Sequence, residues 1–208
     1  MKNIKNFIKK QNSKKLIFTP GPGSLLEENL IGLTPSFGRG DKDYEAMEAK
    51  VLNKLKSMSG HKNIVRMQGS GSLAIEIMCH NFLSGKILII DTGFYSDRLI
   101  KICEGAKKIE KKIKKIHKVN WKDLNKVTNK YNWLLACPTE TSKGLLLPIK
   151  TIRKLGKKIK AKIMLDATAS FGLEKNHNLA DVISYSSCKG LFGLTGASFI
   201  AYNQKPNF

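Results

Sequence analysis

Arginine is scarce in this chain, although the chain is strongly basic. Lys and Arg together number 37 against 16 Asp and Glu, a formal net charge of +21 at pH 7, yet the arginines are only Arg39, Arg66, Arg98 and Arg153. Specific recognition of bases and phosphates favours the forked guanidinium of arginine, and the lysines are spread along the whole sequence. We therefore expect no nucleic-acid partner.

Closely spaced cysteines and long apolar segments are also absent. Cys79, Cys103, Cys137 and Cys188 form no CxxC pattern, so we expect neither a bound metal nor a disulfide framework, and free thiols suit a reducing compartment. No apolar run approaches the length that crosses a bilayer or forms a signal peptide. The sequence predicts a cytoplasmic protein without a membrane partner.

The chain has enough apolar residues for one substantial core, with 41% hydrophobic content over 208 residues. Residues 1–15 are rich in lysine and asparagine and are expected to form an N-terminal arm. Over residues 16–208, short apolar runs alternate with helical patterns, which predicts an α/β fold whose ligands lie at the C-terminal ends of parallel strands. The predicted strands are 63–68, 86–91, 131–137, 162–166 and 179–185.

Two helical patterns flank these strands. Residues 44–58 carry apolar side chains at the spacing of one helix face and are followed by Ser59 and Gly60, which predicts a helix that ends there. In the lysine-rich run 107–118, isoleucines recur every third or fourth residue.

A glycine- and serine-rich turn, Gly69-Ser70-Gly71-Ser72, opens a predicted helix that continues to Phe82. Bare N–H groups, hydroxyls and the positive end of the helix dipole together favour a phosphate. An ordinary capped helix start also favours Ser and Gly, so this turn alone leaves both interpretations open.

Polar and aromatic residues follow the later strands. Tyr95 follows 86–91, and an aromatic side chain there either packs in the core or stacks on a planar ring. Asp166 ends 162–166 and is a helix cap, a metal ligand or a partner for a protonated ring nitrogen, and no metal-ligating residue lies nearby at ligand spacing.

Lys189 follows the last of these strands, between a small polar run and a glycine-rich turn. Burial there would favour the neutral amine, which a lysine needs in order to form a Schiff base with an aldehyde. The alternative is that Lys189 is one more solvated lysine. A phosphate cradle, an aromatic ring, a carboxylate and a lysine at successive strand ends are together the parts of a pyridoxal phosphate site.

The order of these motifs resembles that of the class V aminotransferases, and within that group it is most similar to the 2-aminoethylphosphonate:pyruvate aminotransferases, over roughly residues 16–203. The motifs that carry the resemblance are Thr19-Pro20-Gly21-Pro22, Gly69-Ser70-Gly71-Ser72, Gly93-Phe94-Tyr95, Glu140-Thr141-Ser142, the run from Asp166 to Gly172, and Ser187-Cys188-Lys189. The resemblance implies the large domain of a fold-type I pyridoxal phosphate enzyme, with a mostly parallel seven-stranded sheet flanked by helices and an antiparallel last strand at 196–202.

The resemblance also implies the roles of single residues. Lys189 would form the Schiff base with pyridoxal phosphate, Asp166 would pair with the ring nitrogen, and Tyr95 would stack on the ring. Thr141 would contact the region of the ring hydroxyl. The phosphate would be held by Ser70, Gly71 and Ser72. A small-molecule amino donor, a 2-oxo acid acceptor such as pyruvate, and a homodimer are expected on the same ground.

Two departures accompany the resemblance. Cys188 stands where the family usually has Gln or Asn, and a thiol cannot donate an amide hydrogen bond to a phosphate. The family's C-terminal small domain and its substrate-carboxylate arginine lie beyond Phe208, so we expect only the large domain in this chain. Arg39, on a loop between glycines, is a candidate clamp for a phosphonate or carboxylate, although it would also pair with neighbouring aspartates.

Three alternatives stay open on the sequence. One is an alanine:glyoxylate-type aminotransferase. The second is a lyase of the same fold, such as a cysteine desulfurase, although those enzymes stack a histidine where this chain has Tyr95. The third is a truncated, non-catalytic fragment that retains the fold.

Overall fold

A computed structural model describes residues 2–12, 19, 21–23, 26, 28–29, 32, 35–38 and 40–207. Its centre is a seven-stranded sheet with the strand order β1-β9-β8-β7-β4-β2-β3. The strands are β1 (Asn63–Gln68), β2 (Gly85–Asp91), β3 (Ile113–Asn120), β4 (Trp133–Ala136), β7 (Lys162–Asp166), β8 (Val182–Ser186) and β9 (Ala197–Tyr202). A separate two-stranded ribbon joins β5 (Thr139–Glu140) to β6 (Leu145–Leu146).

The sheet is mostly parallel. Strands β3, β2, β4, β7 and β8 pair in parallel, whereas β9 runs antiparallel to both of its neighbours, β8 and β1. Strands β1 and β8 both run antiparallel to β9 and therefore point in the same direction. The C-terminal ends of β1, β2, β4, β7 and β8 thus lie together, at one end of the strands. The predicted α/β class and the antiparallel last strand are confirmed.

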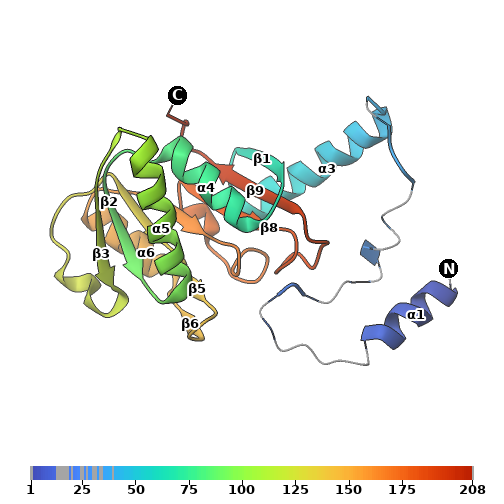
Figure 1. The fold of residues 1–208 in the computed structure, drawn as a ribbon. Coiled ribbons are helices and arrows are strands. Elements are labelled where there is room, and N and C mark those ends of the chain that lie inside the picture. The colour runs from blue at the N-terminus through green and yellow to red at the C-terminus, as the bar shows by residue number, and fades with distance from the viewer. Residues whose placement is uncertain are drawn as a thin grey trace.

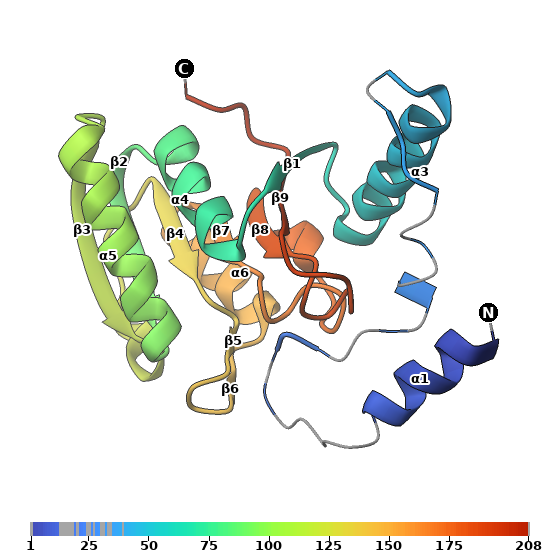
Figure 2. The ribbon, with the colours of Figure 1, turned by 45° about the vertical axis from the view of Figure 1, so that its right-hand side comes forward.

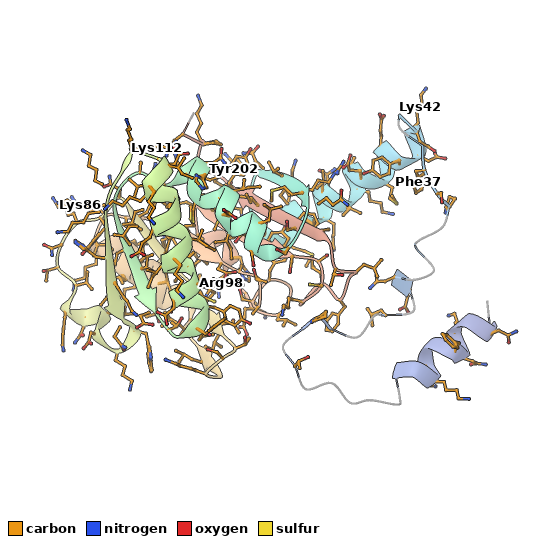
Figure 3. All side chains as sticks on the ribbon, in the orientation of Figure 1. Phe37, Lys42, Lys86, Arg98, Lys112 and Tyr202 are labelled. Atoms are coloured by element: carbon orange, nitrogen blue, oxygen red, sulfur yellow. The ribbon has the colours of Figure 1, made fainter. Side chains whose placement is uncertain are left out.

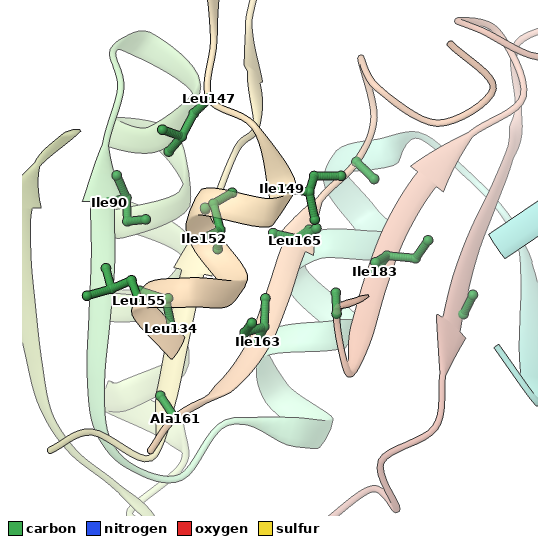
Figure 4. Packing of buried hydrophobic residues seen from close by; sticks show 14 of the residues in the cluster. Ile90, Leu134, Leu147, Ile149, Ile152, Leu155, Ala161, Ile163, Leu165 and Ile183 are labelled. Atoms are coloured by element: carbon green, nitrogen blue, oxygen red, sulfur yellow. The ribbon is translucent and has the colours of Figure 1, made fainter. Parts of the chain in front are cut away.

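Helices cover both faces of the sheet (Figure 1). Helices α4 (Gly71–Phe82) and α5 (Phe94–Ile109) pack on one face, and α6 (Ile149–Lys158) packs on the other. Alternate strand residues supply the two cores: Ile87 and Ile89 face α4 and α5, whereas Leu88 and Ile90 join the cluster around α6 (Figure 4). Burial on both faces explains the continuous apolar runs from which these strands were predicted.

Helix α3 (Lys42–Ser59) projects from the β1 edge of the sheet, and α1 (Lys2–Asn12) lies apart from the sheet in both views (Figures 1 and 2). Gly60 ends α3 in the left-handed conformation, with its N–H bonded to the carbonyl of Lys56, so the predicted end of this helix is confirmed. Met47 and Val51, on the face predicted to be apolar, are exposed in the single chain.

The lysine-rich run 107–118 is divided between two elements. It contains the end of α5 and the start of β3, an edge strand on which Ile113 is buried and the neighbouring lysines are exposed. The isoleucine spacing therefore does not mark one helix, and β3 was not predicted from the sequence. Lysines along an edge strand hinder pairing with other chains.

In the part of the chain that the structure describes, no helix is both long and apolar enough to cross a membrane. The same described residues contain no group of three His, Cys, Asp or Glu side chains arranged to hold a metal ion.

Candidate active site

Two adjoining cavities lie at the edge of the sheet where the parallel strands end. The inner cavity is the smaller of the two. Its lining residues are Tyr95, Arg98, Cys137, Thr139, Thr141, Asp166, Thr168, Ala169 and Lys189. The outer cavity shares Tyr95, Arg98, Thr168 and Lys189 with it and extends to the Gly69–Ser72 turn and Cys188. The two cavities therefore form one continuous site.

Asp166 is the last residue of β7, and only 2% of its surface is exposed. One carboxylate oxygen, Oδ1, accepts a hydrogen bond of 3.0 Å from the backbone N–H of Thr168. The other, Oδ2, lies 3.6 Å from Nη2 of Arg98. Since a buried carboxylate is costly without partners, these two contacts hold it at the cavity wall.

Arg98 lines both cavities and was given no role from the sequence. Besides Asp166, its guanidinium donates a 3.2 Å hydrogen bond to Oγ of Ser72 and lies 5.0 Å from the centre of the Tyr95 ring. It stands three residues after Tyr95, on the side of α5 toward α4 (Figure 3). Two features of the sequence could have identified Arg98 as a site residue: the scarcity of arginine and the i, i+3 spacing from Tyr95.

Tyr95 belongs to the first turn of α5, which a buried glutamate fixes in place. Glu140 is 0% exposed, and its Oε2 accepts hydrogen bonds from the backbone N–H groups of Tyr95 (3.0 Å) and Ser96 (3.4 Å). Ser142 Oγ donates to Oε1 at 2.5 Å. A carboxylate at a helix N-terminus satisfies free N–H groups and complements the helix dipole.

The Gly69–Ser72 turn forms the start of α4. Ser70 is the N-cap, because its side chain accepts from the N–H of Leu73 at 3.4 Å. A methyl group on Gly71 would lie 2.9 Å from Oγ1 of Thr168, so only glycine allows this close approach. The first N–H groups of a helix have no acceptor within it, and at α4 they adjoin the outer cavity.

Lys189 lies in the loop between β8 and β9 and borders both cavities. The N-terminal loop packs against it: the N–H of Gly23 donates to the carbonyl of Cys188 at 3.0 Å. A methyl group on Gly21 would lie 2.8 Å from Nζ of Lys189. The loop therefore passes directly over the lysine side chain.

Cys137, Thr139 and Thr141 come from the segment that leaves β4, and all three line the inner cavity. Burial, with a smaller contribution from the Asp166 carboxylate, raises the pKa of the Cys137 thiol far above its ordinary value. The thiol is therefore protonated at neutral pH, and a thiolate role for Cys137 is disfavoured.

Seven residues were predicted from sequence to hold or act with a cofactor, and all of them border this site. Tyr95, Thr141, Asp166 and Lys189 line the inner cavity, and the other three form the turn at its outer part: Ser70, Gly71 and Ser72. Their individual roles stay predictions. The predicted substrate residue Arg39, together with Pro20, lies outside the described residues.

Unpartnered polar atoms show that the site suits a polar ligand. Arg98 Nε, Thr139 Oγ1 and Thr168 Oγ1 are buried and have no hydrogen-bond partner within the described part of the chain, although buried polar groups are normally paired. All three residues line the inner cavity. A small planar molecule with polar substituents and an anionic group would satisfy them and reach the start of α4, so the residues present fit pyridoxal phosphate.

The chain is similar in sequence to curated aminotransferases, while no family model matches it. It is 26% identical over 200 residues to the 2-aminoethylphosphonate–pyruvate transaminase of Pseudomonas aeruginosa PAO1, covering 89% of this chain and 53% of that protein. It is 29% identical over 207 residues to a bifunctional phosphonoacetaldehyde hydrolase/aminoethylphosphonate transaminase of Clostridioides difficile, covering 91% of this chain and 32% of that protein. The chain thus spans about half the length of the first relative, and less of the second.

Solved structures with the same fold include several aminotransferases and also a cysteine desulfurase. The aspartate aminotransferase of Thermus thermophilus matches with a TM-score of 0.78 at 21% identity, over 88% of this chain and 55% of that one. The pyridoxamine-pyruvate aminotransferase of Mesorhizobium loti matches with a TM-score of 0.77 at 20% identity, over 89% and 50%. The resemblance to class V aminotransferases and the predicted fold class are therefore confirmed.

Proposed function

We propose that this chain, whose sequence relatives and fold are those of aminotransferases, binds pyridoxal phosphate and takes part in moving an amino group from a small donor to a 2-oxo acid. The observation that carries the proposal is the convergence of Lys189, Asp166 and Tyr95 on one cavity that adjoins a glycine-rich helix start. When bound there, pyridoxal phosphate would supply an electron sink for breaking a bond at the amino-bearing carbon.

In this proposal the cofactor would span both cavities. The N-terminus of α4, with Ser70, Gly71 and Ser72, would hold the phosphate. Tyr95 would stack on the ring, Thr141 would lie near the ring hydroxyl, and Asp166 would keep the ring nitrogen protonated. Asp166 suits this role because it is buried and held by two contacts, so little reorganisation is needed on binding.

Lys189 would both attach the cofactor and move a proton. Its Nζ would hold the cofactor through the aldehyde carbon, with loss of water, and as a free amine it would act as the base that takes a proton from the amino-bearing carbon of the donor. The close passage of Gly21 beside Nζ supports this assignment, because the loop limits where the amine can lie.

The donor that we propose is 2-aminoethylphosphonate, with pyruvate as acceptor, because both first-named relatives carry this donor in their names. Arg39 is the proposed clamp for the donor's anionic group, on the strength of its guanidinium fork. Its loop lies close in sequence to Asp41 and Asp43, so pairing with those carboxylates is the competing role.

The oligomeric state, the cellular location and the domain organisation are also proposals. We propose a homodimer in the cytoplasm, and the exposed Met47 and Val51 on the projecting helix α3 support association. We also propose that residues 16–208 are a pyridoxal phosphate-binding large domain preceded by an arm at 1–15, and that activity requires a small domain beyond Phe208.

Amino transfer in the complete enzyme tests this function. The chain, joined to the C-terminal part that its relatives possess, is given 2-aminoethylphosphonate or alanine with pyruvate or glyoxylate as acceptor, before and after Arg39→Ala. The proposal predicts transfer from 2-aminoethylphosphonate that Arg39→Ala reduces more than transfer from alanine.

Two results would contradict parts of the proposal. Equal loss with both donors removes Arg39 from donor selection. An absence of transfer from any amino donor, in protein that holds pyridoxal phosphate, would favour the lyase or non-catalytic alternative.

A further inference from the structure

Arg98 contacts three groups that the proposed function assigns to three different parts of the cofactor. Its Nη1 donates to Oγ of Ser72 at the phosphate end, and its Nη2 lies 3.6 Å from Oδ2 of Asp166 at the ring-nitrogen end. Its Cζ lies 5.0 Å from the centre of the Tyr95 ring, within the range of a cation–π contact. One guanidinium thus links α4, α5 and β7.

The contact with Asp166 matters because that carboxylate is deeply buried. The side chain of Asp166 is 1% exposed, whereas that of Arg98 is 31% exposed. Among the ion pairs of the described residues, Asp166 pairs with Arg98 alone. Removing one partner of a buried charge pair is strongly destabilising, since the other charge is left uncompensated.

The contact with Ser72 matters because the predicted phosphate site at the Gly69–Ser72 turn lacks one hydrogen-bond donor that the family usually has. Cys188 cannot donate an amide hydrogen bond to a phosphate, and its Sγ lies 3.7 Å from Oγ of Ser186. A guanidinium bonded to Ser72 brings a permanent positive charge to the same turn. The charge attracts a dianion, and the hydrogen bond fixes the serine hydroxyl.

We propose that Arg98 is a positioning residue that fixes Asp166 and Ser72 relative to each other, and so sets the spacing between the ring-nitrogen and phosphate contacts. The inference rests on the proposed function, which names these contacts. Arginine suits the task because its rigid fork reaches two acceptors at once, and lysine has a single charged point.

Equilibrium titration with pyridoxal phosphate, followed by absorbance, tests the role of Arg98. Arg98→Met removes the charge at similar length, and we expect binding to weaken roughly tenfold or more, because hydrogen bonds to charged groups are stronger than neutral ones. The affinity of the Arg98→Lys protein should lie between those of the unmodified protein and the Arg98→Met protein. Arg66→Met is the matched control, since Arg66 is exposed and pairs with Glu48 away from the cavities.

A double-mutant cycle shows whether Arg98 acts through its two partners. If it does, Arg98→Met should weaken binding by less than about threefold in protein that already carries Ser72→Ala and Asp166→Asn. A purely structural role would give the same loss in every background. The pH at which the bound cofactor's absorption changes should also shift in Arg98→Met and stay unchanged in Arg66→Met.

Urea unfolding without cofactor separates this inference from the proposed function. The Arg98→Met and Asp166→Asn changes should be non-additive in the free energy of unfolding, because the two side chains are in contact. If pyridoxal phosphate fails to bind the unmodified chain, the proposed function is wrong, whatever the unfolding cycle shows. If it binds the Arg98→Met protein as tightly as the unmodified protein, or if the unfolding effects are additive, the role of Arg98 is overturned.

Discussion

The carboxylate of Glu140 accepts a 3.0 Å hydrogen bond from the backbone N–H of Tyr95, 45 residues earlier in the chain. The same oxygen, Oε2, accepts from Thr92 Oγ1 at 3.3 Å. Strand β5 therefore caps α5, and the aromatic side chain of the site is placed by a residue that does not line the inner cavity itself.

This relationship predicts the effect of Glu140→Ala. The change leaves several buried donors without an acceptor, and we expect the free energy of unfolding to fall by roughly 2–3 kcal/mol. Glu140→Gln keeps one oxygen and should lose less. Urea unfolding followed by circular dichroism measures both, and an unchanged midpoint in Glu140→Ala would contradict the capping role.

Gly21→Ala should disturb Lys189 without touching the sheet. Gly21 has φ +151°, and an added methyl group would lie 2.8 Å from Nζ of Lys189, so either the loop or the lysine side chain must shift. Since strained backbone costs on the order of 1–3 kcal/mol, we expect pyridoxal phosphate to bind roughly tenfold more weakly. Gly38→Ala is the control, because nothing lies within 4 Å of the added methyl group there. Equal affinities in the two variants would show that the loop does not restrain Lys189.

Protonation of His177 should lower the free energy of unfolding in mild acid. The residue is 4% exposed and its Nε2 lies 2.9 Å from Oγ of Ser170. Burial lowers the pKa of His177 to about 4. The unfolded chain, with an ordinary histidine pKa near 6.5, binds this proton first as the pH falls. Stability should therefore be undiminished above about pH 6.5 and fall by up to roughly 3 kcal/mol as the pH approaches 4.

Unfolding by urea at several pH values between 7 and 4 measures this dependence. His177→Asn should be less stable at pH 7 but should show a shallower decline than the unmodified chain. The same slope in both proteins would mean that His177 does not titrate in this range.

Local patterns in the sequence were sufficient to predict most of the sheet. The run Lys162–Asp166 is apolar because both faces of β7 are buried, and the same reasoning found β2, β4 and β8. Strand β3 was missed because it is an exposed, lysine-rich edge strand whose apolar residues are few. Its position depends on pairing with β2, which no local pattern expresses.

Part of the site could be predicted because some of its residues lie at or just after the ends of predicted strands. Asp166 ends β7 and Lys189 lies three residues after β8, which pairs with β7, so the topology brings them together. Arg98 lies within a helix, and its contact with Asp166 joins residues 68 positions apart. Glu140 likewise caps a helix that begins far earlier in the chain. Such contacts depend on the packing of α5 against the sheet and have no signature in nearby residues.

We propose that one lysine, Lys189, carries the cofactor. Sodium borohydride reduction of the protein with stoichiometric pyridoxal phosphate, followed by peptide mass mapping, tests it most directly, because the reduction fixes the cofactor to the nitrogen that holds it. The chain has 37 Lys and Arg residues, of which four are arginine, so many other lysines compete for the label. We expect a single labelled peptide containing Lys189 and no specific label in Lys189→Ala. Label on another lysine, or label spread over the exposed lysines, would contradict it.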